Sequence, residues 1–238
     1  PRLDKFVAQC DNLTCLLEAI NDESVLVCSA AMSVIARLAY HSPNVIMPQL
    51  RKILVQLVRQ LQQNEDGRLR EDSVILLTEL IKGANILLKP YIETIRDPLI
   101  AQLDFPDVDA VAVAALGELS LVSSEHVAPY QNVLLDKIVA LIDEKGGKKT
   151  MMALKALGQI VSTTGCVISP YLSHPKLLDG LINIIQSPSS PHNVKLRCEA
   201  TRAFGILGVA EPAKLKKMKA KLGHGGGVEY ENVKLALQ

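Results

Sequence analysis

Residues 157–172 read LGQIVSTTGCVISPYL, an apolar run that ends at Gly165 and starts again at a Pro-Tyr pair. Similar apolar runs precede four prolines, which are spaced 42, 39 and 41 residues apart: Pro48, Pro90, Pro129 and Pro170. A large apolar residue, here termed the anchor, precedes each proline by ten positions: Leu38, Leu80, Leu119 and Ile160. A constant local offset inside a looser period means that helices keep their length while the loops vary. The stretch is therefore one unit of a repeat.

Alignment on the anchors, with Leu207 as the fifth, produces columns of similar residues. Three positions before each anchor stands another large residue: Ile35, Leu77, Leu116, Leu157 and Phe204. Two positions before the last three anchors stands a glycine: Gly117, Gly158 and Gly205. Glycine inside a helix costs about 1 kcal/mol relative to alanine. Three glycines at one aligned position therefore predict close contact with a neighbouring helix.

Each unit combines two helices of different character. The first, which we expect to begin at the proline, is amphipathic. In PQLRKILVQLVRQL, residues 48–61, the apolar residues recur at helical spacing on one face, and the other face carries Arg51, Lys52, Gln56 and Arg59. A short turn such as residues 64–67 (NEDG) leads into the second helix, which is almost entirely apolar. That helix can leave water only by packing against neighbouring units.

The repeat pattern predicts an all-α fold, an α-solenoid of about five HEAT-type helix pairs. Each repeat contains two helices, and its length of about 41 residues exceeds the lengths of about 33 and 34 residues in ankyrin and TPR arrays. Arg70 and Arg197 stand ten residues before their anchors, as does the basic residue that opens the second helix of a HEAT unit. We expect a repeat segment at 1–212, part of a longer solenoid, and a basic, glycine-rich tail at 213–238. The pairs are expected near residues 1–40, 48–83, 90–122, 129–163 and 170–210.

Composition excludes several classes of protein. The chain has 238 residues, 48% of them apolar, which is enough for a substantial core. Its 26 Lys and Arg residues against 25 Asp and Glu give a net charge of +1, so the chain as a whole does not attract nucleic acid. No apolar run approaches the roughly 18 residues that span a bilayer, and no leader peptide opens the sequence. We expect a soluble intracellular protein without a transmembrane segment.

The sequence offers no catalytic, cofactor-binding or metal site. Residues 146–150 (GGKKT) lack the spacing of a phosphate-binding loop, and the histidines fall at expected turns without a metal-binding pattern. The five cysteines form no CxxC pair, and we interpret them as reduced thiols. We therefore expect no cofactor, no metal and no enzyme activity in this chain. Two alternatives stay open: an independent HEAT adaptor, such as a phosphatase scaffold or transport receptor, and a small all-helical enzyme.

One local cluster of charge is a candidate binding surface. It follows Pro212 and consists of five lysines: Lys214, Lys216, Lys217, Lys219 and Lys221. A solvated helix that leads into the glycine-rich residues 223–227 is the simpler interpretation. The functional interpretation is contact with an acidic partner or an anionic lipid surface. Nucleic-acid binding is not expected, because no aromatic residues are interleaved with the lysines.

Four stretches resemble one protein family. They are LGQIVSTTGCVISPYLSHPKLLDGLINIIQ (157–186), RCEATRAFGILGVAEP (197–212), LLKPYIETIRDPLIAQL (87–103) and VAVAALGELSLVSSEHVAPY (111–130). Together they resemble the HEAT-repeat region of the TOR (target of rapamycin) serine/threonine kinases. The resemblance implies a non-catalytic scaffold segment in growth and nutrient signalling, because no kinase glycine-rich loop, HRD or DFG element occurs here. It also implies a Raptor-type adaptor and a second TOR copy as partners. The implied location is the cytoplasm, with peripheral contact to endomembranes through the complex.

Overall fold

The computed structural model describes residues 10–41, 43–64, 66–144, 147–165, 170, 173–174, 176–187 and 191–208. Within these residues the chain is helical and contains no strand. The chain divides into two compact units, with the boundary between Tyr130 and Gln131. The sequence led us to expect one repeat segment at 1–212, and it did not indicate this boundary. The expected tail at 213–238 lies outside the described residues.

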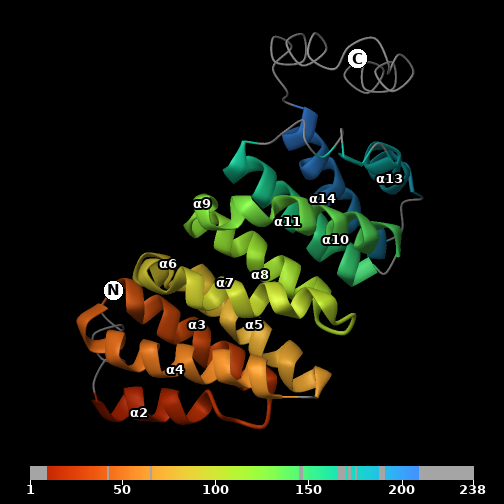
Figure 1. Ribbon diagram of the computed structural model, residues 1–238. Helices are drawn as coiled ribbons and strands as arrows, with labels where there is room; N and C mark the ends of the chain where they lie inside the picture. Colours follow the sequence, from red (N-terminus) through yellow and green to blue (C-terminus); the bar gives the residue numbers. More distant parts are fainter. Residues whose placement is uncertain are drawn as a thin grey trace. The chain divides into compact units, whose positions relative to one another are not determined.

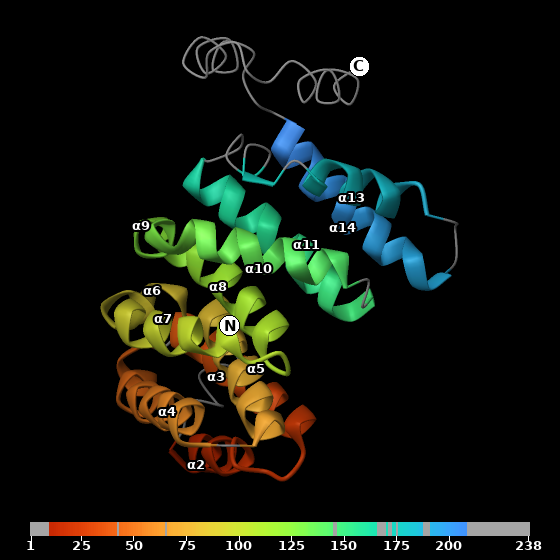
Figure 2. The same cartoon turned by 45° about the vertical axis from the view of Figure 1, so that its right-hand side comes forward.

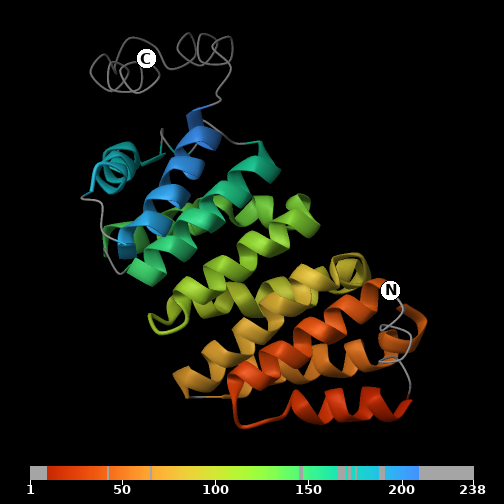
Figure 3. The same cartoon turned by 180° about the vertical axis from the view of Figure 1, so that it is seen from behind.

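The described residues of the first unit form three helix pairs. The pairs are α2 (Cys10–Ala19) with α3 (Val25–His41), α4 (Pro43–Gln63) with α5 (Gly67–Gly83), and α7 (Ile92–Ala101) with α8 (Asp109–Val122). The second helices, α3, α5 and α8, pack side by side in sequence order, while α4 contacts α7 (Figures 1 and 3). The second helices of the pairs therefore form one layer of this unit, covered by the first helices.

Short helical segments connect these pairs. Before α7 the chain forms α6 (Asn85–Leu88) and the 3-10 turn η1 (Lys89–Tyr91), and after it the 3-10 turn η2 (Gln102–Asp104). The unit ends with α9 (Ser124–Val127) and the 3-10 turn η3 (Ala128–Tyr130). Leu88 and Val127 are buried in these connections. Each connection thus contributes an apolar side chain to the core.

In the part of the second unit that the structure describes there are two helix pairs. They are α10 (Gln131–Asp143) with α11 (Gly147–Thr164), and α13 (Lys176–Ile185) with α14 (Pro191–Gly208). Helix α11 packs against α10 and α14, and α13 packs against α14 (Figure 2). Gly165, with φ of 69°, ends α11 and donates its N–H to the carbonyl of Val161 at 3.0 Å. Within each unit successive pairs stack in sequence order, so the fold class is an all-α solenoid.

The aligned repeat positions lie in the core. All five anchors have 0% exposure: Leu38, Leu80, Leu119, Ile160 and Leu207. The same holds three positions earlier for Ile35, Leu77, Leu116 and Leu157, while Phe204 in α14 is half-buried. A core built from equivalent positions of successive pairs explains why no single pair could stand alone in water.

The aligned glycines differ in their surroundings. Gly117 is buried in α8. A Cβ added at Gly158 in α11 would lie 3.2 Å from Cδ1 of Ile206, in the following pair. Gly205 in α14 is exposed, and a Cβ there would meet no described atom within 4 Å. The described residues contain no helix pair after α14, so close contact at Gly205 stays a prediction.

The prolines were expected to begin the first helices, and this prediction is wrong for α4. That helix begins at Pro43, which occupies the first turn, and Pro48 lies inside it. The buried neighbours Ile46 and Leu50 stabilise the helix on both sides of Pro48, which itself removes one backbone hydrogen bond. Pro90 and Pro129 lie in η1 and η3, directly before α7 and α10. The prolines therefore recur with the repeat, but their position relative to the first helix differs from one pair to the next.

Candidate interaction surface

Among the described residues, those singled out for metal or phosphate chemistry do not assemble into a site. The described part of the chain has no group of three or more His, Cys, Asp or Glu side chains placed to hold a metal ion. None of its helices is long and apolar enough to cross a membrane. Residues 147–150 of the glycine-lysine stretch form the first turn of α11 and not a loop. The lysine cluster of residues 214–221 lies outside the described residues, so its role stays a prediction.

Two histidines form local pairs. Ser123 Oγ and Nδ1 of His126 are 2.7 Å apart; Ser123 occupies the N-cap position of α9, but its side chain makes no hydrogen bond to the backbone of that helix. Among the described residues no carboxylate is bonded to His126, so the pair lacks the third group that orients a catalytic base. In the second unit, Nε2 of His174 lies 3.0 Å from Oδ1 of Asp136. The first pair is a contact between two side chains of one short helical segment, and the second is a bridge to α10.

The two arginines that marked the HEAT pattern point inward. Arg70 is buried, and its guanidinium carbon lies 4.0 Å from the centroid of the Phe105 ring. Arg197 donates from Nε to the carbonyl of Ile185 at 3.0 Å. A guanidinium that stacks on a ring or binds a helix-end carbonyl stabilises its own repeat. These residues are therefore structural.

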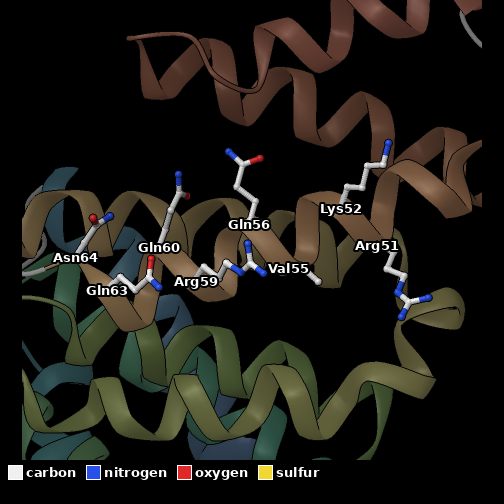
Figure 4. Close-up of a pocket in the computed structure, with 8 residues that line it drawn as sticks. All are labelled: Arg51, Lys52, Val55, Gln56, Arg59, Gln60, Gln63 and Asn64. Atoms are coloured by element: carbon white, nitrogen blue, oxygen red, sulfur yellow. The ribbon is translucent and has the colours of Figure 1, made fainter.

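The outer face of α4 is the candidate interaction surface. Eight side chains stand on it in two rows, and residues four apart are neighbours in each row. The first row is Arg51, Val55, Arg59 and Gln63, and the second is Lys52, Gln56, Gln60 and Asn64 (Figure 4). All eight line a pocket of about 570 Å³, here termed the α4 groove. The groove thus combines three cations, four amides and one apolar side chain.

Hydrogen bonds hold two of these amides in place. Nε2 of Gln56 donates to Oδ1 of Asn21 at 2.9 Å, and Oε1 of Gln60 accepts a bond from Oγ of Ser73 at 3.3 Å. The cations are different, because Arg51, Lys52 and Arg59 are exposed and form no ion pair or hydrogen bond with any described residue. The groove therefore presents positioned amides beside cations that are available to a partner.

Helix α7 of the same unit carries a cation, Arg96, that is paired with a carboxylate. Nε and Nη2 of Arg96 lie 2.8 and 2.7 Å from Oδ1 of Asp97, and its guanidinium lies 5.2 Å from the Tyr130 ring. The hydrogen bond that Arg96 donates to Asp97 raises the pKa of Arg96 above its ordinary value, although burial opposes the shift. Arg96 is thus paired within its own helix, whereas the cations of α4 are not.

The groove continues toward the third helix pair. Gln63 and Asn64, at the end of α4, also line a second pocket of about 690 Å³. Pro98 and Phe105 form its apolar wall, and the Phe105 side chain is 41% exposed. A partner lying along α4 would therefore meet cations first and an aromatic ring at the end of the helix.

Sequence periodicity identified the polar face of α4 but not its significance. It assigned Arg51, Lys52, Gln56 and Arg59 to the solvated side of an amphipathic helix. The missed signal is a local absence of acids, because residues 25–64 contain four Lys or Arg and no Asp or Glu. The charge of the whole chain is nearly balanced, so its acidic residues are concentrated outside residues 25–64.

Comparison with known proteins places the fold and the family. Two crystal structures of engineered proteins match this chain, with TM-scores of 0.62 and 0.59 at 19% and 15% identity. The first match covers 95% of this chain and 97% of the engineered protein, and the second covers 95% of each. At such low identity the likeness shows the fold alone.

The curated relatives are kinases of one family. The chain is 34% identical to the serine/threonine-protein kinase tor1 of Schizosaccharomyces pombe over 218 residues, and 34% identical to TOR2 of Saccharomyces cerevisiae over 229 residues. It is 35% identical to TOR of Oryza sativa over 230 residues. These alignments cover 89%, 95% and 93% of this chain but only 9% of each relative.

A family comparison agrees with these relatives. Residues 167–235 match the family described as the serine/threonine-protein kinase mTOR domain. The match begins near the stretch that revealed the repeat and runs past the last described helix. Together with the helix pairs and the alignments over most of the chain, it shows that this chain corresponds to a helical-repeat region of the TOR serine/threonine kinases.

Proposed function

We propose that this chain is a non-catalytic scaffold segment of a TOR-type kinase, which holds a Raptor-type adaptor and a second kinase copy in the complex. The observation that carries the proposal is the alignment of about nine-tenths of the chain with TOR kinases, of which it spans only 9%. A segment of that size can contribute geometry to a large kinase without contributing chemistry. Its setting is growth and nutrient signalling in the cytoplasm, with endomembranes reached through the complex.

The physical basis of the proposal is preorganisation. A core of equivalent apolar positions fixes the surface of each unit before a partner arrives, so binding does not have to order the scaffold. The sequence also holds no kinase motif that would give the segment an activity of its own. Similarity to TOR kinases favours this proposal over an independent adaptor such as a phosphatase scaffold.

The test compares two substitutions on the same helix in the full-length parent kinase. Leu116→Asp places a charge at a position with 0% exposure, whereas Leu121→Asp places the same charge at a position that is 55% exposed. We expect Leu116→Asp to release the adaptor or the second kinase copy, measured by co-purification and by the mass of the complex. Leu121→Asp should leave both in place. A complex of unchanged mass and composition with Leu116→Asp would refute the scaffold function.

A further inference from the structure

We propose that the α4 groove binds an acidic segment of a protein partner. The inference rests on the proposed scaffold function, and it adds the surface and the chemistry of the contact. The occupant is a peptide segment with two carboxylate groups separated by an apolar side chain. Charge complementarity, the spacing of the cations and the other side chains of the groove each support this occupant.

Local charge is the first argument. Residues 25–64 carry a net charge of +4, while the whole chain carries +1, so the other 198 residues carry a net −3. Three of the four cations, Arg51, Lys52 and Arg59, line the α4 groove, and no described carboxylate pairs with them. Unpaired cations at the rim of a binding surface speed the approach of an acidic partner and disfavour a basic one.

The spacing within the first row defines what the partner must present. Arg51 and Arg59 are eight residues apart in α4, which places their Cα atoms about 12 Å apart along the helix axis. Val55 lies midway between them and is 40% exposed. A helical partner would match this row with acidic residues about two turns apart and an apolar residue between them. Arginine suits this contact because its planar fork can bind a carboxylate through two hydrogen bonds.

The other side chains of the groove favour a peptide over a simple anion. Gln56 and Gln60 are held by Asn21 and Ser73, so their amides are already oriented beside the cations. At the end of α4 the groove opens onto Phe105, which offers a partly exposed ring to a second apolar side chain. A bound phosphate or a flat lipid surface would use the cations and leave Val55 and Phe105 without a role.

The test uses the 238-residue chain and a defined probe. The probe is a fluorescein-labelled, alanine-based helical peptide with two pairs of glutamates about two turns apart and a leucine between them. A companion peptide has glutamine in place of every glutamate. Binding is followed by fluorescence anisotropy at low and at physiological salt, because charge-driven binding weakens as salt rises.

A charge-reversal variant and a matched control decide the outcome. Arg51→Glu/Lys52→Glu/Arg59→Glu should raise the Kd of the acidic peptide about tenfold or more. Lys89→Glu/Lys148→Glu/Lys195→Glu changes the net charge equally at three exposed positions elsewhere, and should raise it less than about threefold. Arg59→Gln, which adds no negative charge, should give a smaller loss in the same direction. Circular dichroism should show unchanged helicity in all of these variants, since the substituted side chains are exposed.

Three results would overturn the groove proposal: equal Kd values for the α4 variant and its control, equal binding of both peptides, or no binding of the acidic peptide. Phosphatidylserine vesicles or single-stranded RNA that bind through the three α4 cations, when the peptide does not, would assign the surface to another anion. The scaffold function is tested separately by Leu116→Asp. If that variant dissociates the complex, but the α4 substitutions do not change the Kd of the acidic peptide, only the groove proposal is refuted.

Discussion

Gly83 and Gly205 are both glycines within second helices of their pairs, yet they have opposite surroundings. A Cβ added at Gly83, at the end of α5, would overlap the methyl group of Ala36 in α3 and lie 3.2 Å from the Ala36 backbone. A Cβ added at Gly205 in α14 would meet no described atom. Ala36 occupies the same aligned position as Gly205. A small residue is therefore needed where two helices lie close together, as at Gly83 and Ala36. The presence of a glycine does not by itself show that another helix lies close to it.

The difference shows how the repeat column should be interpreted. In both units the small residue two positions before the anchor faces the next second helix along the chain: Ala36 faces α5 and Gly158 faces α14. The contact is backbone-close at Ala36, where a larger side chain would force the helices apart, whereas at Gly158 it involves only the end of the Ile206 side chain. Substitutions at these sites measure how closely each pair is packed.

The largest effect is expected where packing between pairs is complete. Leu116→Asp in α8 should destabilise the first unit by more than about 4 kcal/mol, because it removes a buried side chain and introduces a charge. Hydrogen exchange should accelerate in α5 and α7 as well as in α8, because α8 packs against both. Acceleration confined to α8 would mean that the pairs of this unit are independent.

Gly83→Ala should destabilise the first unit by about 1–3 kcal/mol, the usual cost of overpacking. Denaturant unfolding of the chain measures the change. The double variant Ala36→Gly/Gly83→Ala removes the methyl group that the new Cβ meets, so it should recover part of the loss in a double-mutant cycle. Strictly additive effects would show that the two helices do not constrain each other.

Gly205→Ala should stabilise the second unit by about 0.5–1 kcal/mol. Alanine favours the helix over glycine, and no described atom opposes the new methyl group. Thermal unfolding of the same chain supplies the measurement. A loss of stability instead would reveal a neighbour at this position that the described residues do not include.

Gly158→Ala should change stability least, by less than about 0.5 kcal/mol in either direction. The gain in helix propensity is opposed by a contact of 3.2 Å with Cδ1 of Ile206, the flexible end of that side chain. Ile206→Val shortens the neighbouring side chain and removes this contact. In the Ile206→Val background, Gly158→Ala should therefore stabilise the chain relative to Ile206→Val alone. A loss in that background as well would place the obstacle elsewhere.

Helix pairs and anchors were predictable because helix length depends on residues that are close together in the sequence. The offset of ten residues between anchor and proline does not depend on the loops, and all five anchors are fully buried. The turn before α5 was visible for a similar reason, since Oδ1 of Asp66 accepts a hydrogen bond from the N–H of Arg68 at 2.9 Å. Signals of this kind depend only on residues a few positions apart.

Features that depend on distant neighbours were not predictable. The four-residue helices α6 and α9 are too short to show periodicity. The unit boundary falls after the Pro-Tyr pair at residues 129–130, although the pair at 90–91 looks the same in the sequence and lies inside the first unit. Periodicity likewise located the polar face of α4, but the groove depends on what lies around that helix and on the lack of carboxylates among its eight lining residues.

Pro48 divides α4 into two parts of unequal strength. Proline has no N–H to donate, so the carbonyl of Asn44 loses its usual partner one turn earlier in the helix. Under a pulling force on the chain, the turn before Pro48 should open before the rest of α4. All eight groove residues follow Pro48, so the groove would keep its form while the preceding turn yielded. A scaffold under mechanical load would in this way lengthen at one point while a partner stayed bound to the groove.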